Sequence, residues 1–263
     1  MQYILDFIWT LFYGIIEGIT EWLPISSTGH LIIFESFTKP SFSDAFLEMF
    51  RVVIQLGAIL AVVVIFWKKI WPFHTSKHLD TYSYKSKTSL TEFATKYCYM
   101  DKIILWLKIL VACLPAIIIG LPFDDWMDKH LYNEFTVATT LIIGCFQVLS
   151  LVPGTSRSGS TILGAIILCC SRTAAAEFSF LLGIPVMFGA SGLKAVKFLA
   201  EGNALSGFEW SILLFGMIVA FVVSMFTISF LMNFVKKHNF KCFGYYRIAL
   251  GILLLALSAF ITV

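Results

Sequence analysis

The chain has 263 residues, of which 59% are hydrophobic and 13% are charged, and its mean hydropathy is +0.86. This charged content excludes an ordinary soluble domain, in which about a quarter of the residues are charged, and the net charge of +3 is too small to indicate a nucleic-acid-binding protein. We therefore expect an all-α, polytopic integral membrane protein in which residues 1–263 form a single membrane domain.

The N-terminal segment, "MQYILDFIWTLFYGIIEGITEW", is apolar but lacks a basic start and a small-residue cleavage site, so we expect it to remain in the mature protein. On a helix, Gly14, Glu17, Gly18 and Glu21 share one stripe. Small residues on that stripe allow a second helix to approach, so both glutamates should face protein. Carboxylates one turn apart suit a divalent-cation site or an acid–base pair, and a structural pair with an arginine is the alternative.

The residues after Pro24 form the first polar break in this apolar region. The run Ser26-Ser27-Thr28-Gly29-His30 places three hydroxyls at a predicted helix start, where free backbone N–H groups favour an anion. Helix capping would explain one hydroxyl but not three and a histidine. His30 could serve as the base or acid for a nucleophilic Ser27, or it could be a packed histidine with a satisfied ring.

Charge predicts the orientation of the spans that follow. Lysines crowd the polar loop at residues 72–101 and the start of the last span, so these ends should be cytoplasmic, whereas the acidic loops near 124–128 and 201–209 should face outward. The six cysteines contain no CxxC pair, which argues against a metal site or a disulfide framework. The predicted spans are Phe46–Trp67, Ile103–Pro122, Phe178–Leu199, Trp210–Phe234 and Phe243–Val263.

A second segment, "FQVLSLVPGTSRSGSTI" at 146–162, repeats the pattern of the first break. Pro24 and Pro153 are 129 residues apart and Gly57 and Gly183 are 126 apart, which indicates a duplicated unit with halves at about 1–125 and 135–263. Duplicated membrane units are often inverted repeats with broken helices. The arms beside each break have too few apolar residues to cross, so we predict two re-entrant helical hairpins, with a kinked helix as the alternative.

The second break has the composition of an anion-binding nest. Glycines permit close backbone approach, and Arg157 is its only charged residue. A guanidinium binds phosphate oxygens in a forked geometry and stays charged. Carboxylates, hydroxyls, a histidine and an arginine together predict a phosphoryl-transfer site in the membrane, with a lipid phosphate as substrate.

These motifs resemble a known family. "EGITEWLPISSTGHL" and "PGTSRSGSTI" are similar to the two signature segments of the bacterial undecaprenyl-diphosphatases of the BacA type, and "VIQLGAILAV", "AAEFSFLLGIP" and "YRIALGI" extend the match. The resemblance implies hydrolysis of undecaprenyl diphosphate to the monophosphate and phosphate, which recycles the lipid carrier of cell-wall synthesis and is linked to bacitracin resistance. It also implies a divalent cation (Mg²⁺ or Ca²⁺), a site that opens to the outer face of the plasma membrane, and a homodimer as one assembly to test.

The resemblance also implies roles for individual residues. Glu17 and Glu21 would hold the cation, Ser27 would be the nucleophile with His30 as its partner, and Arg157 would bind the diphosphate. Glu21 or His30 would accept the proton of Ser27, and direct attack by an activated water is the alternative. The expected phosphate-binding residues are Ser26, Thr28, Ser156, Ser158 and Thr161.

Two other functions compete with this interpretation. A polyprenyl-phosphate transporter or flippase could use the same repeat architecture, but binding alone does not require the Ser27, His30 and Glu21 combination. An acid phosphatase with a histidine nucleophile is disfavoured because the expected upstream Lys and Arg-Pro segment is absent.

The repeat predicts one more span than the first half supplies. Three spans follow the second break, but only two lie between the breaks, and "NEFTVATTLIIGCFQVL" resembles the start of a further helix joined directly to the arm of the second hairpin. The apolar residues 135–152 are too few to form both a span and that arm. Three interpretations follow: the second motif lies at the inner end of a true span, the charge rule fails for this chain, or the chain is a shortened variant that lacks one spanning helix before the second motif.

Overall fold

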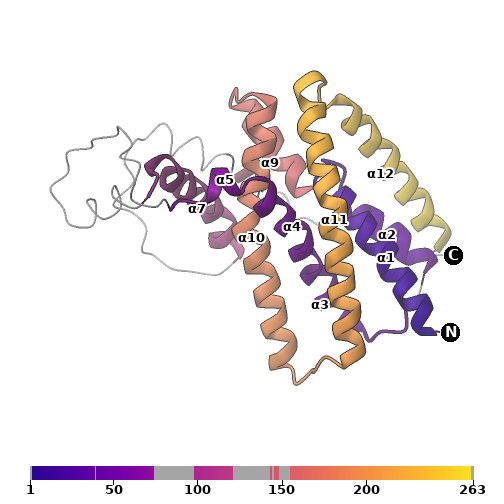
Figure 1. Cartoon of the computed structure of the whole chain (residues 1–263). Coiled ribbons are helices and arrows are strands. Elements are labelled where there is room, and N and C mark those ends of the chain that lie inside the picture. Colours follow the sequence, from indigo (N-terminus) through magenta and orange to yellow (C-terminus); the bar gives the residue numbers. More distant parts are fainter. Residues whose placement is uncertain are drawn as a thin grey trace.

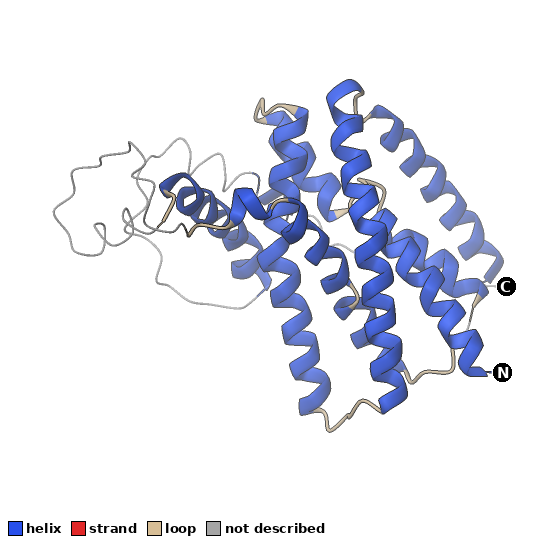
Figure 2. Cartoon of the chain, viewed as in Figure 1, coloured by secondary structure: helices blue, strands red, loops and turns tan. Residues whose placement is uncertain are grey.

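The computed structural model describes residues 2–38, 40–73, 98–120, 143, 145–147 and 155–261, with side chains given up to residue 115 in the third range and to residue 256 in the last. Helices dominate this part of the chain (Figures 1 and 2). They are α1 (Gln2–Thr20), α2 (Ser27–Phe37), α3 (Asp44–Val53), α4 (Gln55–Ile65), α5 (Trp67–Ile70), α7 (Met100–Gly120), α9 (Arg157–Ile167), α10 (Arg172–Ala200), α11 (Gly207–Lys237) and α12 (Lys241–Ile261).

The first polar break forms a helical hairpin. Helix α1 ends at Thr20, a turn with Pro24 follows, and α2 then runs back along α1. Two contacts show this direction: Trp9 donates a hydrogen bond to Thr38 at 3.2 Å, and its ring lies 6.1 Å from that of Phe34. Of the two arms, α2 rises only about 16 Å. Helix α1, however, is long and apolar enough to cross a membrane, so the prediction that both arms are too short is wrong for α1. Its two buried carboxylates, Asp6 and Glu17, interrupt an otherwise apolar helix without shortening it.

The predicted small-residue stripe on α1 is confirmed. A side chain at Gly14 would lie 2.9 Å from Val219, and one at Gly18 would lie 2.8 Å from Val223, so α11 packs directly on these two glycines. Glu17 lies between them and is completely buried. The stripe therefore turns its carboxylate toward protein, as the spacing predicts.

The predicted spans appear as helices, although one is interrupted. Helices α3 and α4 join at Ile54 to cover residues 44–65, and α7, α10, α11 and α12 cover the others. Within the described part of the chain, four stretches are long and apolar enough to cross a membrane: Gln2–Thr20, Asp44–Ile65, Arg172–Ala200 and Gly207–Lys237. The chain is therefore a multi-pass helical membrane protein.

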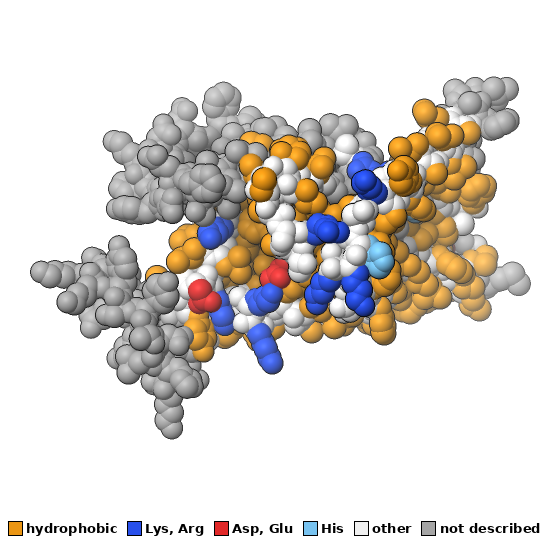
Figure 3. Space-filling model, turned by 90° about the horizontal axis from the view of Figure 1, so that it is seen from above, with side chains coloured by type: hydrophobic (Ala, Val, Ile, Leu, Met, Phe, Trp, Pro, Cys, Tyr) orange, Lys and Arg blue, Asp and Glu red, His pale blue; other side chains and the backbone are white. Residues whose placement is uncertain are grey.

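Basic residues gather at one end of the helices. This end is where α10 begins, α11 ends and α12 begins, and Figure 3 views the molecule from above, toward it. The exposed basic side chains there are Lys68, Lys69, Arg172, Lys236, Lys237 and Lys241. The opposite connection, between α10 and α11, carries Glu201 and Glu209. The distribution agrees with the orientation predicted from charge. Most of the predicted cytoplasmic loop (74–97) and the acidic loop near 124–128 lie outside the described residues.

Candidate active site

Glu21 connects the two sequence motifs. It lies in the turn directly after α1, and its side chain is 9% exposed. Its Oε2 accepts a hydrogen bond from the Ser27 hydroxyl at 3.0 Å, and its Oε1 accepts one from Arg157 Nη2 at 2.8 Å. One carboxylate therefore holds both the nucleophile candidate of the first motif and the only cation of the second.

The first turn of α9 rests on the turn of the first motif. Ser156 caps α9 by accepting a hydrogen bond from Gly159 N at 3.1 Å. Ser158 donates to the backbone oxygen of Glu21 at 3.2 Å and to that of Leu23 at 3.4 Å. These side-chain bonds to backbone fix the start of α9 against the first break, so the position of Arg157 does not depend on its ion pair alone.

Arg157 is held between Glu21 and α10. Its side chain is only 14% exposed, and Nη1 has no hydrogen-bond partner among the described residues. The guanidinium lies directly over Gly183 of α10, where a Cβ would clash with Nη1. A buried guanidinium with one unpartnered nitrogen retains hydrogen-bonding capacity for an anion, since buried polar groups are normally paired.

Glu17 is the second acidic group of the site. Both of its carboxylate oxygens are buried and have no hydrogen-bond partner among the described residues. No group of three or more His, Cys, Asp or Glu side chains suited to a metal occurs in that part of the chain. Two carboxylates nevertheless suit an ion such as Mg²⁺, which proteins bind through one or two carboxylates together with substrate phosphates. The residues present therefore fit such an ion.

His30 is turned away from Ser27 in this structure. Its Nδ1 lies 2.7 Å from the backbone oxygen of Ser26, and its Nε2 lies 2.7 Å from the hydroxyl of Tyr246 on α12. Both ring nitrogens are thus engaged, and the Ser27 hydroxyl bonds to Glu21 instead. Of the two proton acceptors that the sequence suggests for Ser27, the geometry favours Glu21.

The other residues predicted to bind phosphate cap a helix, contact a neighbouring helix or lie exposed. The Ser26 hydroxyl accepts from Gly29 N at 3.4 Å and caps α2. Thr161 donates to the backbone oxygens of Arg157 at 3.0 Å and Ser158 at 3.2 Å and also contacts Ser179 of α10. Thr28 is exposed and does not join these contacts. Pro153 lies outside the described residues.

Sequence reasoning missed two residues of this neighbourhood. Gly183 supports Arg157, and Tyr246 holds His30. Both lie in segments that carry the family resemblance, "AAEFSFLLGIP" and "YRIALGI", so a signal was present. Gly183 has no side chain and Tyr246 is not a usual nucleophile, so neither residue by itself indicates a site.

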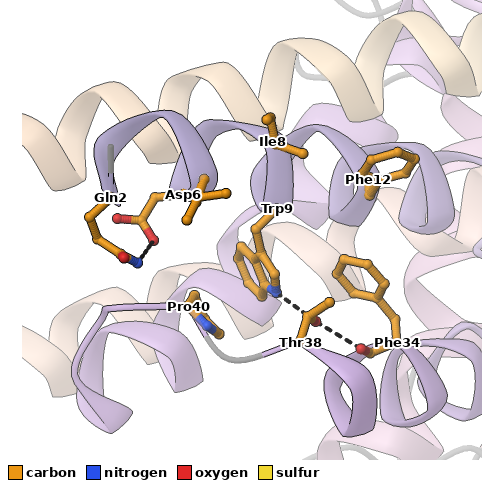
Figure 4. Close-up of a pocket in the computed structure, with 9 residues that line it drawn as sticks. Gln2, Asp6, Ile8, Trp9, Phe12, Phe34, Thr38 and Pro40 are labelled. Atoms are coloured by element: carbon orange, nitrogen blue, oxygen red, sulfur yellow. Dashed lines mark hydrogen bonds between the residues drawn. The ribbon is translucent and has the colours of Figure 1, made fainter.

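A cavity of about 500 Å³ lies elsewhere, between α1 and the end of α2. Figure 4 shows Trp9, Phe12 and Phe34 lining it, together with the polar side chains of Gln2 and Asp6. None of the predicted site residues borders it. The cavity is therefore distinct from the cluster around Glu21.

Fold and site together define a class: a helical membrane protein in which a carboxylate, a hydroxyl and a guanidinium meet, an arrangement that can serve phosphoryl transfer. A sequence model of the family described as Bacitracin resistance protein BacA matches residues 10–144 and 132–253. The chain belongs to this family.

Three similar proteins, each named undecaprenyl-diphosphatase, cover most of the chain. The one from Acetivibrio thermocellus is 51% identical over 282 positions (95% of this chain and 96% of that protein). Those from Enterococcus faecalis and Lactococcus lactis subsp. cremoris are 50% and 49% identical over 275 and 290 positions. They cover 92% and 97% of this chain, and 94% and 98% of their own lengths.

The alignments also bear on the expected shortening. The alignment with the Acetivibrio protein has 282 positions but covers 95% of the 263 residues here, about 250, which is a surplus of about 32 positions. The Lactococcus alignment has 290 positions and covers 97% of the chain, about 255 residues, which is a surplus of about 35. These relatives therefore contain residues without a counterpart here, and they are more than the roughly 20 that one spanning helix needs. The two segments that match the family overlap at residues 132–144, where the sequence predicts the junction.

Proposed function

We propose that this protein hydrolyses undecaprenyl diphosphate to undecaprenyl phosphate and phosphate and so recycles the lipid carrier of cell-wall synthesis. The relatives named undecaprenyl-diphosphatase support this function. The structural observation that carries the proposal is the bridging of Ser27 and Arg157 by Glu21. Such a bridge places a nucleophile, its base and a phosphate-binding cation within one hydrogen-bonded unit.

The contacts indicate how the residues share the reaction. Arg157 and the N–H groups at the start of α9 bind the diphosphate, and the Ser27 oxygen attacks the terminal phosphorus while its proton passes to Glu21. The bond between this phosphorus and the bridging oxygen breaks, and undecaprenyl phosphate leaves. Water then attacks the phosphorus of the phosphoserine, and the bond between this phosphorus and the Ser27 oxygen breaks. The proton held by Glu21 returns to the Ser27 oxygen, and phosphate leaves with the oxygen and the hydrogens of the water. Attack by a water activated by Glu21 is the one-step alternative.

A divalent cation belongs to this proposal. Glu17 and Glu21 would hold it, because the unpartnered oxygens of Glu17 are available to it. When bound, such an ion neutralises charge on the diphosphate oxygens. We expect phosphate release to require Mg²⁺ or Ca²⁺, and equal release with a chelator would exclude this part of the proposal.

The decisive experiment is phosphate release from undecaprenyl diphosphate by the purified protein, with and without chelator. We expect stoichiometric release of phosphate and recovery of the monophosphate lipid. Recovery of the intact diphosphate lipid after prolonged incubation, with its movement across vesicles, would instead identify a flippase.

We also propose that both breaks are re-entrant and that the site opens to the outer face of the plasma membrane. The shortness of α2 supports a re-entrant first break. Single cysteines at Asn133 and Ser171, in a chain whose six native cysteines are replaced, test the path of the second. Labelling from one face would support the re-entrant path and would set aside the outward placement of the acidic loop near 124–128, whereas labelling from opposite faces requires a net crossing and would exclude a re-entrant second break. The predicted homodimer is tested by the mass of the protein in detergent.

A further inference from the structure

The turn before α2 contains an unusual backbone conformation. Ser26 has φ 70° and ψ 97°, and Cys169 is the one other non-glycine residue with positive φ in the described part of the chain. Residues other than Gly, Asn and Asp seldom adopt positive φ, so something must hold Ser26 there. The next residue is Ser27, whose hydroxyl meets Glu21. The conformation of Ser26 therefore determines where the nucleophile candidate points.

His30 is placed to hold this turn. A backbone carbonyl can only accept a hydrogen bond, so the contact of Nδ1 with the Ser26 oxygen at 2.7 Å requires the proton on Nδ1. In the neutral ring Nε2 is then an acceptor, and the Tyr246 hydroxyl at 2.7 Å is its donor. The rings of His30 and Tyr246 are nearly parallel, at 4°, with centroids 5.6 Å apart. A continuous chain of hydrogen bonds thus runs from α12 to the Ser26 backbone.

Besides this chain of hydrogen bonds, α12 has further contacts with α2 and α9. Leu250 and Leu254 lie 3.3 Å and 3.4 Å from the position of a Cβ at Gly29, so α12 packs on the first turn of α2. Arg247 Nη1 lies 3.4 Å from the position of a Cβ at Gly159, in the first turn of α9. One helix therefore touches the starts of both motif helices.

We propose that Tyr246 is a positioning residue of the active site, which acts through His30 to hold Ser26 in its left-handed conformation and so keeps Ser27 on Glu21. His30 is then a positioning residue as well and not the base that deprotonates Ser27. This inference rests on the proposed function for its activity readout. It adds α12 to the two motifs as a third component of the site.

A double-mutant cycle tests the coupling between Tyr246 and Ser26. Tyr246→Phe removes only the hydroxyl and should lower kcat about tenfold, because small misplacements of reacting groups are costly. Ser26→Gly allows positive φ without steric penalty, so in that background Tyr246→Phe should cost less than about twofold. Ser26→Asn, which tolerates positive φ and keeps a capping side chain, serves if the glycine variant does not fold. Tyr245→Phe, at the exposed neighbouring position, is the matched control and should retain full kcat. Equal losses in both backgrounds would overturn the proposal.

Replacement of His30 separates positioning from base catalysis. Asn places an N–H donor near the position of Nδ1, whereas Gln places its amide near the position of Nε2. We expect His30→Asn to retain clearly more activity than His30→Gln, because Asn preserves the bond to the Ser26 oxygen. Equal inactivation of both variants would support a proton-transfer role and contradict ours.

A spectroscopic measurement separates this inference from the proposed function. In ¹⁵N-histidine spectra of the wild-type protein, neutral His30 should be the Nδ1–H tautomer, and Tyr246→Phe should shift its Nε2 resonance. The opposite tautomer, or an unchanged Nε2 resonance, would overturn the positioning chain whether or not the lipid is hydrolysed. If these signals appear as expected but wild-type protein releases no phosphate, the proposed function fails alone.

Discussion

Helices α2 and α9 begin in the same way but present different chemistry. Each has a serine cap whose hydroxyl accepts a hydrogen bond from the glycine three residues later, at 3.4 Å for Ser26 and 3.1 Å for Ser156. The residue after the cap is Ser27 in α2 and Arg157 in α9, and Glu21 binds both. The same capped helix start thus supplies a hydroxyl in the first motif and a guanidinium in the second, so neither motif contains the site alone.

Gly57 and Gly183, which the sequence pattern aligns, show a similar divergence. A Cβ at Gly57 would clash with the backbone of Met217 on α11, whereas one at Gly183 would clash with the guanidinium of Arg157. Both positions require the absence of a side chain. At Gly57 the missing side chain allows α11 to pack closely, whereas at Gly183 it leaves room for the Arg157 guanidinium. Substitutions at the two glycines should therefore disturb helix packing and the site separately.

The largest effect is expected for the hydroxyl of the first half. Ser27→Ala removes the nucleophile and should lower kcat by at least about 10³-fold, as loss of a nucleophile does in serine hydrolases. Ser36→Ala, at an exposed hydroxyl on the same helix, should leave kcat within a few-fold of wild type. Steady-state phosphate release measures both. Substantial turnover in Ser27→Ala would instead favour direct attack by water.

The second-largest effect is expected for Gly183, on which the Arg157 guanidinium lies. Gly183→Ala should displace the Arg157 guanidinium and lower kcat/KM about 10²-fold while the protein still folds, because the obstructing atoms belong to a side chain. Gly189→Ala on the same helix meets nothing within 4 Å and should behave as wild type. Matched activities of the two variants would show that Arg157 does not need its present position.

The smallest effect on catalytic activity is expected for Gly57. Gly57→Ala pushes against the α11 backbone and should destabilise the fold by about 1–3 kcal/mol, as overpacking does. Specific activity of the folded fraction should remain near that of wild type. Thermal unfolding in detergent measures the change, with Gly192→Ala as the unobstructed control. A folded Gly57→Ala protein that has lost activity would place this glycine in the site and remove the contrast between the halves.

Much of this arrangement could be predicted because it follows from local pattern. The glycine stripe of α1, the helix starts at Ser26 and Ser156 and the placement of the apolar spans need only helical spacing, capping chemistry and hydropathy. The partner of His30 could not be predicted. It depends on α12 packing against α2, a contact between residues 216 positions apart.

The pairing around Glu21 shows the same limit. Its separation from Arg157 is 136 residues, and only the packing of α9 on the first turn brings them together. The choice between Glu21 and His30 as the partner of Ser27 depends on the conformation of Ser26, which hydropathy does not encode. The prediction that the first arm has too few apolar residues to cross is wrong for α1, which is long and apolar enough although it contains the buried Glu17.

The most direct test of the central claim, that the two breaks form one catalytic unit through Glu21, is a double-mutant cycle on phosphate release from undecaprenyl diphosphate. Glu21→Gln and Arg157→Ala should each lower kcat/KM by about 10³-fold, and the double variant should be little worse than either, because residues that act as a unit are not additive. Losses that multiply in the double variant, or substantial turnover in either single variant, would contradict the account.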